Sequence, residues 1–144
     1  MEVIRVASPE NLQACLRVRH QVFVLEQHIP ASIEVDGKDV LRGESHHLLL
    51  ADEGKPVATG RWYFQEEGVA KFQRIAVLET HRNRGLGKRI MDEMERQAME
   101  LGAASVVLDA QLSAKRFYDR LGYAAISGPF REAGIEHLRM KKPL

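Results

Sequence analysis

The sequence predicts an α/β fold in which one sheet packs against helices. Short apolar runs typical of strands alternate with amphipathic helical patterns through the second half of the chain. No internal repeat, low-complexity segment or linker rich in Pro, Gly and Ser divides the 144 residues. A single domain spanning residues 1–144 is therefore the simplest interpretation.

The first elements are a short strand and a helix. Residues 2–6 have the composition of a strand, and the Ser-Pro-Glu sequence at 8–10 provides a side-chain cap, a first-turn proline and an early acid. Apolar residues at helical spacing extend this helix to about Phe23. The pattern is lost over 26–43, which predicts a long loop with room for a turn of helix. Loops of this length in small domains are often functional.

The rest of the chain alternates strands and helices. Runs of apolar and β-branched residues predict strands over 47–52, 56–64, 69–78, 105–110, 123–126 and 136–141. An apolar stripe predicts a helix over 84–101 that ends at Gly102, and a shorter helix over 113–121 ends at Gly122. The predicted order is β-α-loop-β-β-β-α-β-α-β-β.

The composition is that of an ordinary globular chain. Hydrophobic residues make up 44%, charged residues 28%, and the formal net charge is +1, so no global field favours nucleic acid or an anionic membrane. The single cysteine, Cys15, cannot form an intrachain disulfide and is expected in the core. The sequence has no pattern of a signal peptide and no apolar segment of membrane-spanning length, so we expect a cytoplasmic protein.

The loop before the long helix is the most informative segment. Four Lys or Arg residues and no acid lie between His81 and Met91. The dipole of a helix start disfavours cations unless an anion binds there, and glycines let the backbone approach that anion closely. The segment therefore predicts a pyrophosphate site; the alternative is a solvated basic helix start.

Two other phosphate-binding motifs do not fit this loop. A Walker loop requires glycine where Arg82 stands and Ser or Thr where Arg89 stands. The dinucleotide fingerprint requires a third glycine where Ile90 stands. Both motifs are excluded.

Residues 82–87, Arg-Asn-Arg-Gly-Leu-Gly, resemble the Arg/Gln-x-x-Gly-x-Gly/Ala motif of the Gcn5-related N-acetyltransferase (GNAT) superfamily. In that family the loop holds the pyrophosphate of coenzyme A, and the preceding strand pairs its backbone with the pantetheine arm. The resemblance implies a central, mixed, mostly antiparallel twisted sheet with a splayed strand pair for the cofactor. It also implies a site for acetyl-CoA made by Ile75, Ala76, Val77, Arg82, Asn83, Arg84, Gly85, Leu86, Gly87 and Lys88.

A second segment, 111–123, is similar to the family pattern Asn-x-x-Ala-x-x-Phe-Tyr-x-x-x-Gly-Phe/Tyr. Gln111 departs from the pattern but keeps a donor and an acceptor, so it can still form a hydrogen bond with the cofactor arm or with the substrate. By resemblance, contacts with the cofactor would come from Gln111, Ala114, Phe117 and Tyr118. The phenol of Tyr118, with a pKa of about 10, suits protonation of a departing thiolate whose pKa is about 8.5. The alternative is a packed core aromatic.

The N-terminal segment 17–27, the His-His-Leu at 46–48 and the segment 134–140 resemble the ElaA/YjcF-like branch of the superfamily. Glyphosate N-acetyltransferase shares part of this layout, including a histidine in the C-terminal strand. That resemblance and its usual pKa make His137 the first candidate for the general base. The alternatives are a half-buried structural histidine, Asp109 acting through water, or attack by an amine that arrives neutral.

The acceptor is expected to contact residues from several segments. A guanidinium grips carboxylate or phosphate well, so Arg74 and Arg19 are candidates for binding an anionic acceptor, together with Glu26. For both arginines the alternative is a surface ion pair. We expect no metal, because His46 and His47 are strand neighbours that point to opposite faces and lack a third ligand.

These observations predict an acetyl-CoA-dependent N-acetyltransferase that transfers acetyl directly to the amine of a small molecule, such as an amino acid. The alternative is a non-catalytic module that binds acyl-CoA for regulation. A nucleic-acid module is poorly supported, because the charge is balanced and the basic run is short. Dimers are common in the resembled family, so a homodimer is among the expectations.

Overall fold

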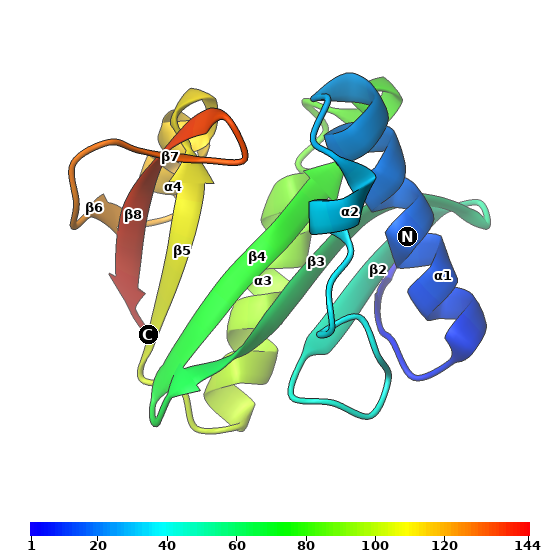
Figure 1. Cartoon of the computed structure of the whole chain (residues 1–144). Coiled ribbons are helices and arrows are strands. Elements are labelled where there is room, and N and C mark those ends of the chain that lie inside the picture. Colours follow the sequence, from blue (N-terminus) through cyan, green and yellow to red (C-terminus); the bar gives the residue numbers. More distant parts are fainter.

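A mixed sheet of eight strands organises the computed structural model, which describes all residues 1–144 (Figure 1). The strand order is β1-β2-β3-β4-β5-β8-β6, and β7 pairs with β8. Only β4 and β5 run parallel, which confirms the predicted mixed, mostly antiparallel sheet. The strands are β1 (Val3–Arg5), β2 (His46–Asp52), β3 (Lys55–Glu66), β4 (Val69–Val77), β5 (Ser105–Gln111), β6 (Ala124–Ala125), β7 (Phe130–Glu132) and β8 (Ile135–Pro143).

Helices cover both faces of this sheet. The helix α3 lies behind the sheet in Figure 1, whereas α1 and α2 lie in front of it. None of the helices is both long and apolar enough to cross a membrane. The helical segments are α1 (Pro9–Arg19), η1 (His20–Glu26), α2 (Ala31–Glu34), η2 (Glu79–His81), α3 (Leu86–Glu100), η3 (Leu112–Ala114) and α4 (Lys115–Arg120).

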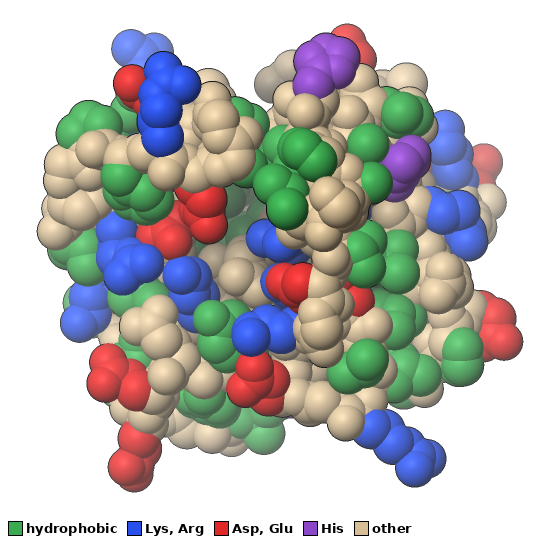
Figure 2. Space-filling model, viewed as in Figure 1, with side chains coloured by type: hydrophobic (Ala, Val, Ile, Leu, Met, Phe, Trp, Pro, Cys, Tyr) green, Lys and Arg blue, Asp and Glu red, His purple; other side chains and the backbone are tan.

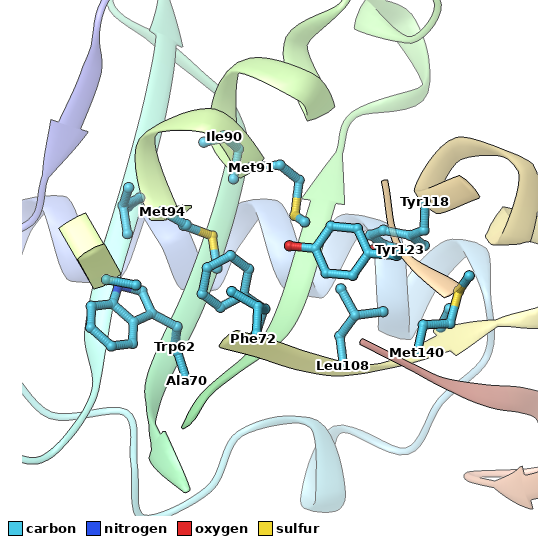
Figure 3. Close-up of a cluster of buried hydrophobic side chains, with 14 of the residues drawn as sticks. Trp62, Ala70, Phe72, Ile90, Met91, Met94, Leu108, Tyr118, Tyr123 and Met140 are labelled. Carbon is cyan, nitrogen blue, oxygen red and sulfur yellow. The ribbon is translucent and has the colours of Figure 1, made fainter. Parts of the chain in front are cut away.

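The main core lies between α3 and the sheet. The apolar stripe of α3 places Ile90 and Met94 in one buried cluster with Trp62 and Phe72, and Met94 lies beside Phe72 (Figure 3). The helix approaches β3 closely at Gly60, where an added Cβ would lie 2.4 Å from the Sδ atom of Met94. A side chain at that position would therefore push α3 away from the sheet.

Two elements differ from the sequence expectation. The first helix was expected to stay α-helical to Phe23, but the segment after Arg19 is a π-helix of seven residues, η1. The apolar spacing of α- and π-helices differs too little over seven residues to separate them. The short strand β7 was missed, because its residues are mostly exposed and form a hairpin with the start of β8.

The sheet splits between β4 and β5. Their pairing ends at Phe72 and Leu108, although β4 continues to Val77 and β5 to Gln111. A β-bulge in β4 sets Arg74 and Ile75 opposite the single residue Gly60 of β3, and Arg74 has a left-handed φ of 56°. Bulges bend and twist the strand that carries them, so this one accompanies the divergence of β4. The predicted splayed strand pair is present.

Candidate active site

The split between β4 and β5 opens into a cleft with a volume of about 950 Å³. Figure 2 shows the hollow in the middle of the molecule, with charged side chains at its rim. One wall comes from η1, α2, β4 and the start of α3, and the other from β5, α4 and β8. The cleft brings together the following predicted residues: Arg74, Ile75, Ala76, Val77, Arg82, Asn83, Gly85, Leu86, Gly87, Lys88, Gln111, Ala114, Phe117, Tyr118 and His137.

The loop before α3 has the geometry of an anion site. Asn83 and Gly85 both adopt left-handed backbone, with φ values of 62° and 75°. No backbone carbonyl accepts a hydrogen bond from the N–H groups of residues 83–88. Successive free N–H groups at a helix start form a concave site for phosphate oxygens. The loop can therefore hold a pyrophosphate through its backbone alone.

The last glycine of this loop serves packing. A Cβ added at Gly87 would lie 3.1 Å from the ring of Phe117. This glycine therefore lets α4 approach the start of α3, so that Phe117 and the neighbouring Tyr118 reach the cleft from its other wall.

Arg82 contacts protein groups as well as the cleft. Its two terminal nitrogens each donate to a different carboxylate oxygen of Glu26 at 2.6 Å, and its Nε donates to the carbonyl of Val77 at 3.0 Å. These hydrogen bonds from Arg82 lower the pKa of Glu26. Glu26 does not line the cleft, so its expected contact with the acceptor is replaced by an ion pair with the phosphate loop.

Arg84 and Lys88, two of the three remaining cations of this segment, are exposed. Arg84 makes no ion pair and lies outside the lining of the cleft. Lys88 lines the cleft, and its ammonium group lies 2.7 Å from Asp92 one helical turn away. An exposed pair of this kind is weak, so Lys88 stays available to an anion.

Tyr118 lies on α4 with its ring buried between Phe117 and Tyr123, both in edge-to-face contact at centroid distances of 5.0 and 5.9 Å. Figure 3 shows Tyr118 and Tyr123 side by side at the edge of the core. Burial raises the pKa of Tyr118, and no hydrogen bond from the protein opposes this rise. The phenol is therefore protonated at neutral pH and able to donate.

His137 lies on β8, opposite Gln111 of β5. Its ring is buried and stacks on Phe130, and its Nδ1 lies 2.7 Å from the carbonyl oxygen of Ile135. A carbonyl only accepts hydrogen bonds, so Nδ1 carries the proton and Nε2 keeps its lone pair. The fold thus selects the tautomer in which Nε2 can accept a proton.

Arg19 is buried away from the cleft, contrary to its expected role in binding the acceptor. It lies 2.6 Å from Glu34 and 2.6 Å from Asp39, and its side chain is 1% exposed. Arg61 continues this buried ion network to Asp36 and Asp39 at 2.7 and 2.9 Å. The network fixes the 26–43 loop against the sheet, which makes Arg19 a structural residue.

Arg74 does line the cleft. Its Nε donates to the carbonyl of Glu34 at 3.1 Å, and its side chain is 25% exposed. Its guanidinium also forms ion pairs with the carboxylates of Glu34 and Asp36, at 3.6 and 3.5 Å. Lys71, also on the lining, donates one hydrogen bond to Asp109 at 3.1 Å. Burial would raise the pKa of Asp109, but hydrogen bonds from Arg139 and Lys71 outweigh it and lower that pKa. Asp109 is therefore a poor alternative base.

Among the polar residues of the cleft that were not assigned from the sequence are Gln27 and His81. Gln27 lies directly after η1 and accepts a hydrogen bond from Gln111 at 2.8 Å. His81 accompanies the phosphate loop, with Nε2 3.0 Å from Asp52 and Nδ1 2.8 Å from the hydroxyl of Thr80. Each contact joins residues that are far apart in the sequence or lie in a loop, so no local pattern marks them.

Four matches to known proteins extend over nearly the whole chain. A family model described as an acetyltransferase (GNAT) domain matches residues 6–144. The uncharacterised N-acetyltransferase YjcF of Bacillus subtilis (strain 168) is 41% identical over 143 residues, 99% of each chain. The crystal structure of an acyl-CoA N-acyltransferase from Pseudomonas aeruginosa has a TM-score of 0.86 and 30% identity, covering 99% of both chains. That of Escherichia coli ElaA has a TM-score of 0.86 and 26% identity, covering 98% of both.

Proposed function

The chain belongs to the GNAT acetyltransferase family, and from this premise we propose that it transfers acetyl from acetyl-CoA directly to the amine of a small anionic molecule. The similarity to YjcF and ElaA confirms the predicted branch of the family. One observation carries the proposal: the free N–H groups of residues 83–88 border the same cleft as Tyr118 and His137. Donor site and reactive side chains thus share one space.

The donor half of the cleft suits coenzyme A. Its pyrophosphate would accept hydrogen bonds from the N–H groups of residues 83–88, helped by Lys88 at the helix start. Its pantetheine arm would lie along the edge of β4 beyond Phe72, where β5 no longer pairs. The name of the Pseudomonas aeruginosa relative, an acyl-CoA N-acyltransferase, supports this class of donor.

The two reactive side chains supply the proton transfers. His137 Nε2 accepts the proton that the attacking amine loses as its nitrogen bonds to the thioester carbonyl carbon. Tyr118 donates its phenolic proton to the sulfur as the carbon–sulfur bond breaks. Holding both substrates in one cleft supplies much of the rate enhancement through orientation.

The acceptor half of the cleft favours a molecule with an anionic group. Lys71 uses only one of its three donors, on Asp109, and Arg74 donates to the backbone of Glu34 and Ile33 while keeping its Nη1 donors free. Both side chains line the cleft within partly buried surroundings, where a charge-assisted hydrogen bond is strong. An amino acid combines such a group with an amine.

Calorimetric titration with acetyl-CoA tests the donor site. We expect saturable binding to the native protein and about 10- to 100-fold weaker binding to an Arg84→Ala/Lys88→Ala variant, which loses two cations near the phosphates. The control is Arg42→Ala/Lys141→Ala, which removes two exposed cations elsewhere. Equal affinities in all three proteins would contradict the assigned phosphate loop.

Release of free thiol from acetyl-CoA in the presence of proteinogenic L-amino acids and simple amines then tests the transfer. Thiol release with formation of an N-acetyl product supports the enzyme. Binding of acetyl-CoA without release for any amine would instead favour a non-catalytic acyl-CoA-binding module.

A further inference from the structure

A pair of glutamines bridges the cleft on the side where α1 and α2 lie. Gln27 comes from the wall that holds η1 and β4, and Gln111 ends β5 on the opposite wall. The Nε2 of Gln111 lies 2.8 Å from the Oε1 of Gln27. The strands stop pairing at Leu108, so this hydrogen bond spans the gap where the backbone no longer does.

The bridge lies on the acceptor side of the sheet. Along β5, Leu108 and Ala110 belong to the core packed against α3, so Asp109 and Gln111 point to the opposite face. His137 of β8 pairs with Gln111 of β5 and lines the same cleft. An acceptor that approaches His137 therefore meets the side-chain amide of Gln111.

Gln27 is held firmly for a residue at the end of a helix. Its own N–H donates to the carbonyl of Val22 at 3.1 Å, which closes the π-helix η1. The preceding residue, Glu26, is fixed to Arg82 by two hydrogen bonds of 2.6 Å. π-helical turns occur often at functional sites, and this one delivers Gln27 to the cleft.

The direction of the bridge determines what Gln111 offers to a substrate. Because Gln111 donates through Nε2, its Oε1 is left without a protein partner. A side-chain amide whose nitrogen is held in this way presents its oxygen as the free acceptor. The N–H of an attacking amine needs such an acceptor while its lone pair points toward the thioester.

We infer that Gln27 is a positioning residue. This role rests on the proposed acetyl transfer. Gln27 fixes the amide of Gln111 so that Oε1 accepts a hydrogen bond from the incoming amine. The acceptor is then gripped at its nitrogen by Gln111 and His137, and at its anionic group by Arg74 and Lys71. Gln27 acts only through Gln111, so its loss affects the acceptor and leaves the donor site intact.

Two substitutions of similar size separate this role from simple packing. Gln27→Glu keeps an acceptor for the Nε2 of Gln111, whereas Gln27→Met fills the same space without one. We expect the acceptor KM to rise about tenfold in Gln27→Met, the loss of one well-placed hydrogen bond, and to stay within about threefold of the native value in Gln27→Glu. The control is Gln21→Met, on the exposed face of the same π-helix.

The experiment has three readouts. Steady-state thiol release, with acetyl-CoA and the L-amino acid that reacts fastest with the native protein, gives the acceptor KM of each variant. Calorimetry gives the affinity of each variant for acetyl-CoA, which we expect to equal that of the native protein. NMR of protein labelled with ¹⁵N-glutamine follows the side-chain NH₂ signals of Gln111, assigned with Gln111→Asn. These signals should move in Gln27→Met and stay near their native positions in Gln27→Glu.

The outcomes distinguish failure of the role of Gln27 from failure of the proposed function. An acceptor KM in Gln27→Met equal to the native value, or unmoved NH₂ signals of Gln111, would overturn the role of Gln27 and leave the proposed function standing. An acceptor KM in Gln27→Glu as high as that in Gln27→Met would also overturn the role of Gln27 and leave the proposed function standing. Absence of thiol release by the native protein with every amine would overturn the proposed function and this role with it.

Discussion

At the scale of single residues, the proposed transfer depends on the environment of Tyr118. Its hydroxyl has no protein hydrogen-bond partner and burial raises its pKa, so the phenol stays protonated, as the proposed proton donor requires. Replacing it with Phe keeps the ring and its contacts with Phe117 and Tyr123. We expect Tyr118→Phe to lower kcat by about 10²- to 10⁴-fold and to leave the affinity for acetyl-CoA unchanged.

Thiol-release kinetics and calorimetry on the same preparation check this expectation. Tyr63→Phe is the matched control, because Tyr63 is a half-exposed residue of β3 that does not line the cleft. Native kcat in Tyr118→Phe would show that the leaving thiolate needs no proton from this residue.

Single residues could be assigned from the sequence where they belong to a short motif of adjacent residues. Gly85 and Tyr118 belong to short motifs whose spacing fixes their place at a helix start or on a helix. Arg19 and Glu26 were expected at the acceptor, yet each pairs with a residue remote in sequence: Arg19 with Glu34 and Asp39, Glu26 with Arg82. Such pairing is set by the tertiary fold, and no local pattern encodes it.

At the scale of elements, the buried ion network holds the 26–43 loop and its helix α2 in place. Asp39 is the central carboxylate, bound to both Arg19 and Arg61. Burial would raise the pKa of Asp39, but the hydrogen bonds and charges of the two arginines outweigh it and hold that pKa well below its usual range. The charged form is thus preferred in the folded protein.

The sign of the acid dependence follows from this lowered pKa. The stabilisation is present above the unfolded value of about 3.9 and is lost as the pH falls toward the folded value. We expect Asp39→Asn to lower the free energy of unfolding by about 3–5 kcal/mol at pH 7. Below about pH 4 the free energy of unfolding should fall less steeply in this variant than in the native protein. Urea unfolding at several pH values measures both effects.

The control is Asp119→Asn, which removes an exposed carboxylate paired with Lys115 on α4. Its stability should follow the native pH profile. Parallel profiles for the native protein and Asp39→Asn would show that another carboxylate governs the loss of stability in acid.

Helices and strands were easier to predict than the irregular features within them. Alternation and apolar stripes located β2 to β5 and α3, because their burial follows one face of a strand or helix. The π-helix η1 and the bulge at Arg74 leave no such pattern, since each depends on one additional residue within a regular element. The split between β4 and β5 was expected only through the family resemblance.

At the scale of the whole molecule, Cys15 reports on global unfolding. It is completely buried against β2, and burial raises the pKa of its thiol to about 11. Both the lack of access and the lack of thiolate suppress its reactivity. We expect aromatic disulfide reagents to modify the thiol only in the small fraction of molecules that is unfolded at equilibrium.

Modification rates measured across a urea series test this expectation, and they should give the free energy of unfolding found by circular dichroism. A Cys15→Ala variant supplies the background rate. Rapid labelling in the absence of urea would mean that α1 detaches from the sheet without global unfolding.

The arrangement around Trp62 has an optical consequence. It is the only tryptophan in the chain, lies fully buried outside the cleft, and stacks on His46 with a centroid distance of 4.4 Å. A protonated imidazole quenches indole emission, but burial and the charge of Arg5 lower the pKa of His46. The emission intensity of Trp62 should therefore be high at neutral pH and should fall in mild acid before the protein unfolds. Binding of coenzyme A should not change it.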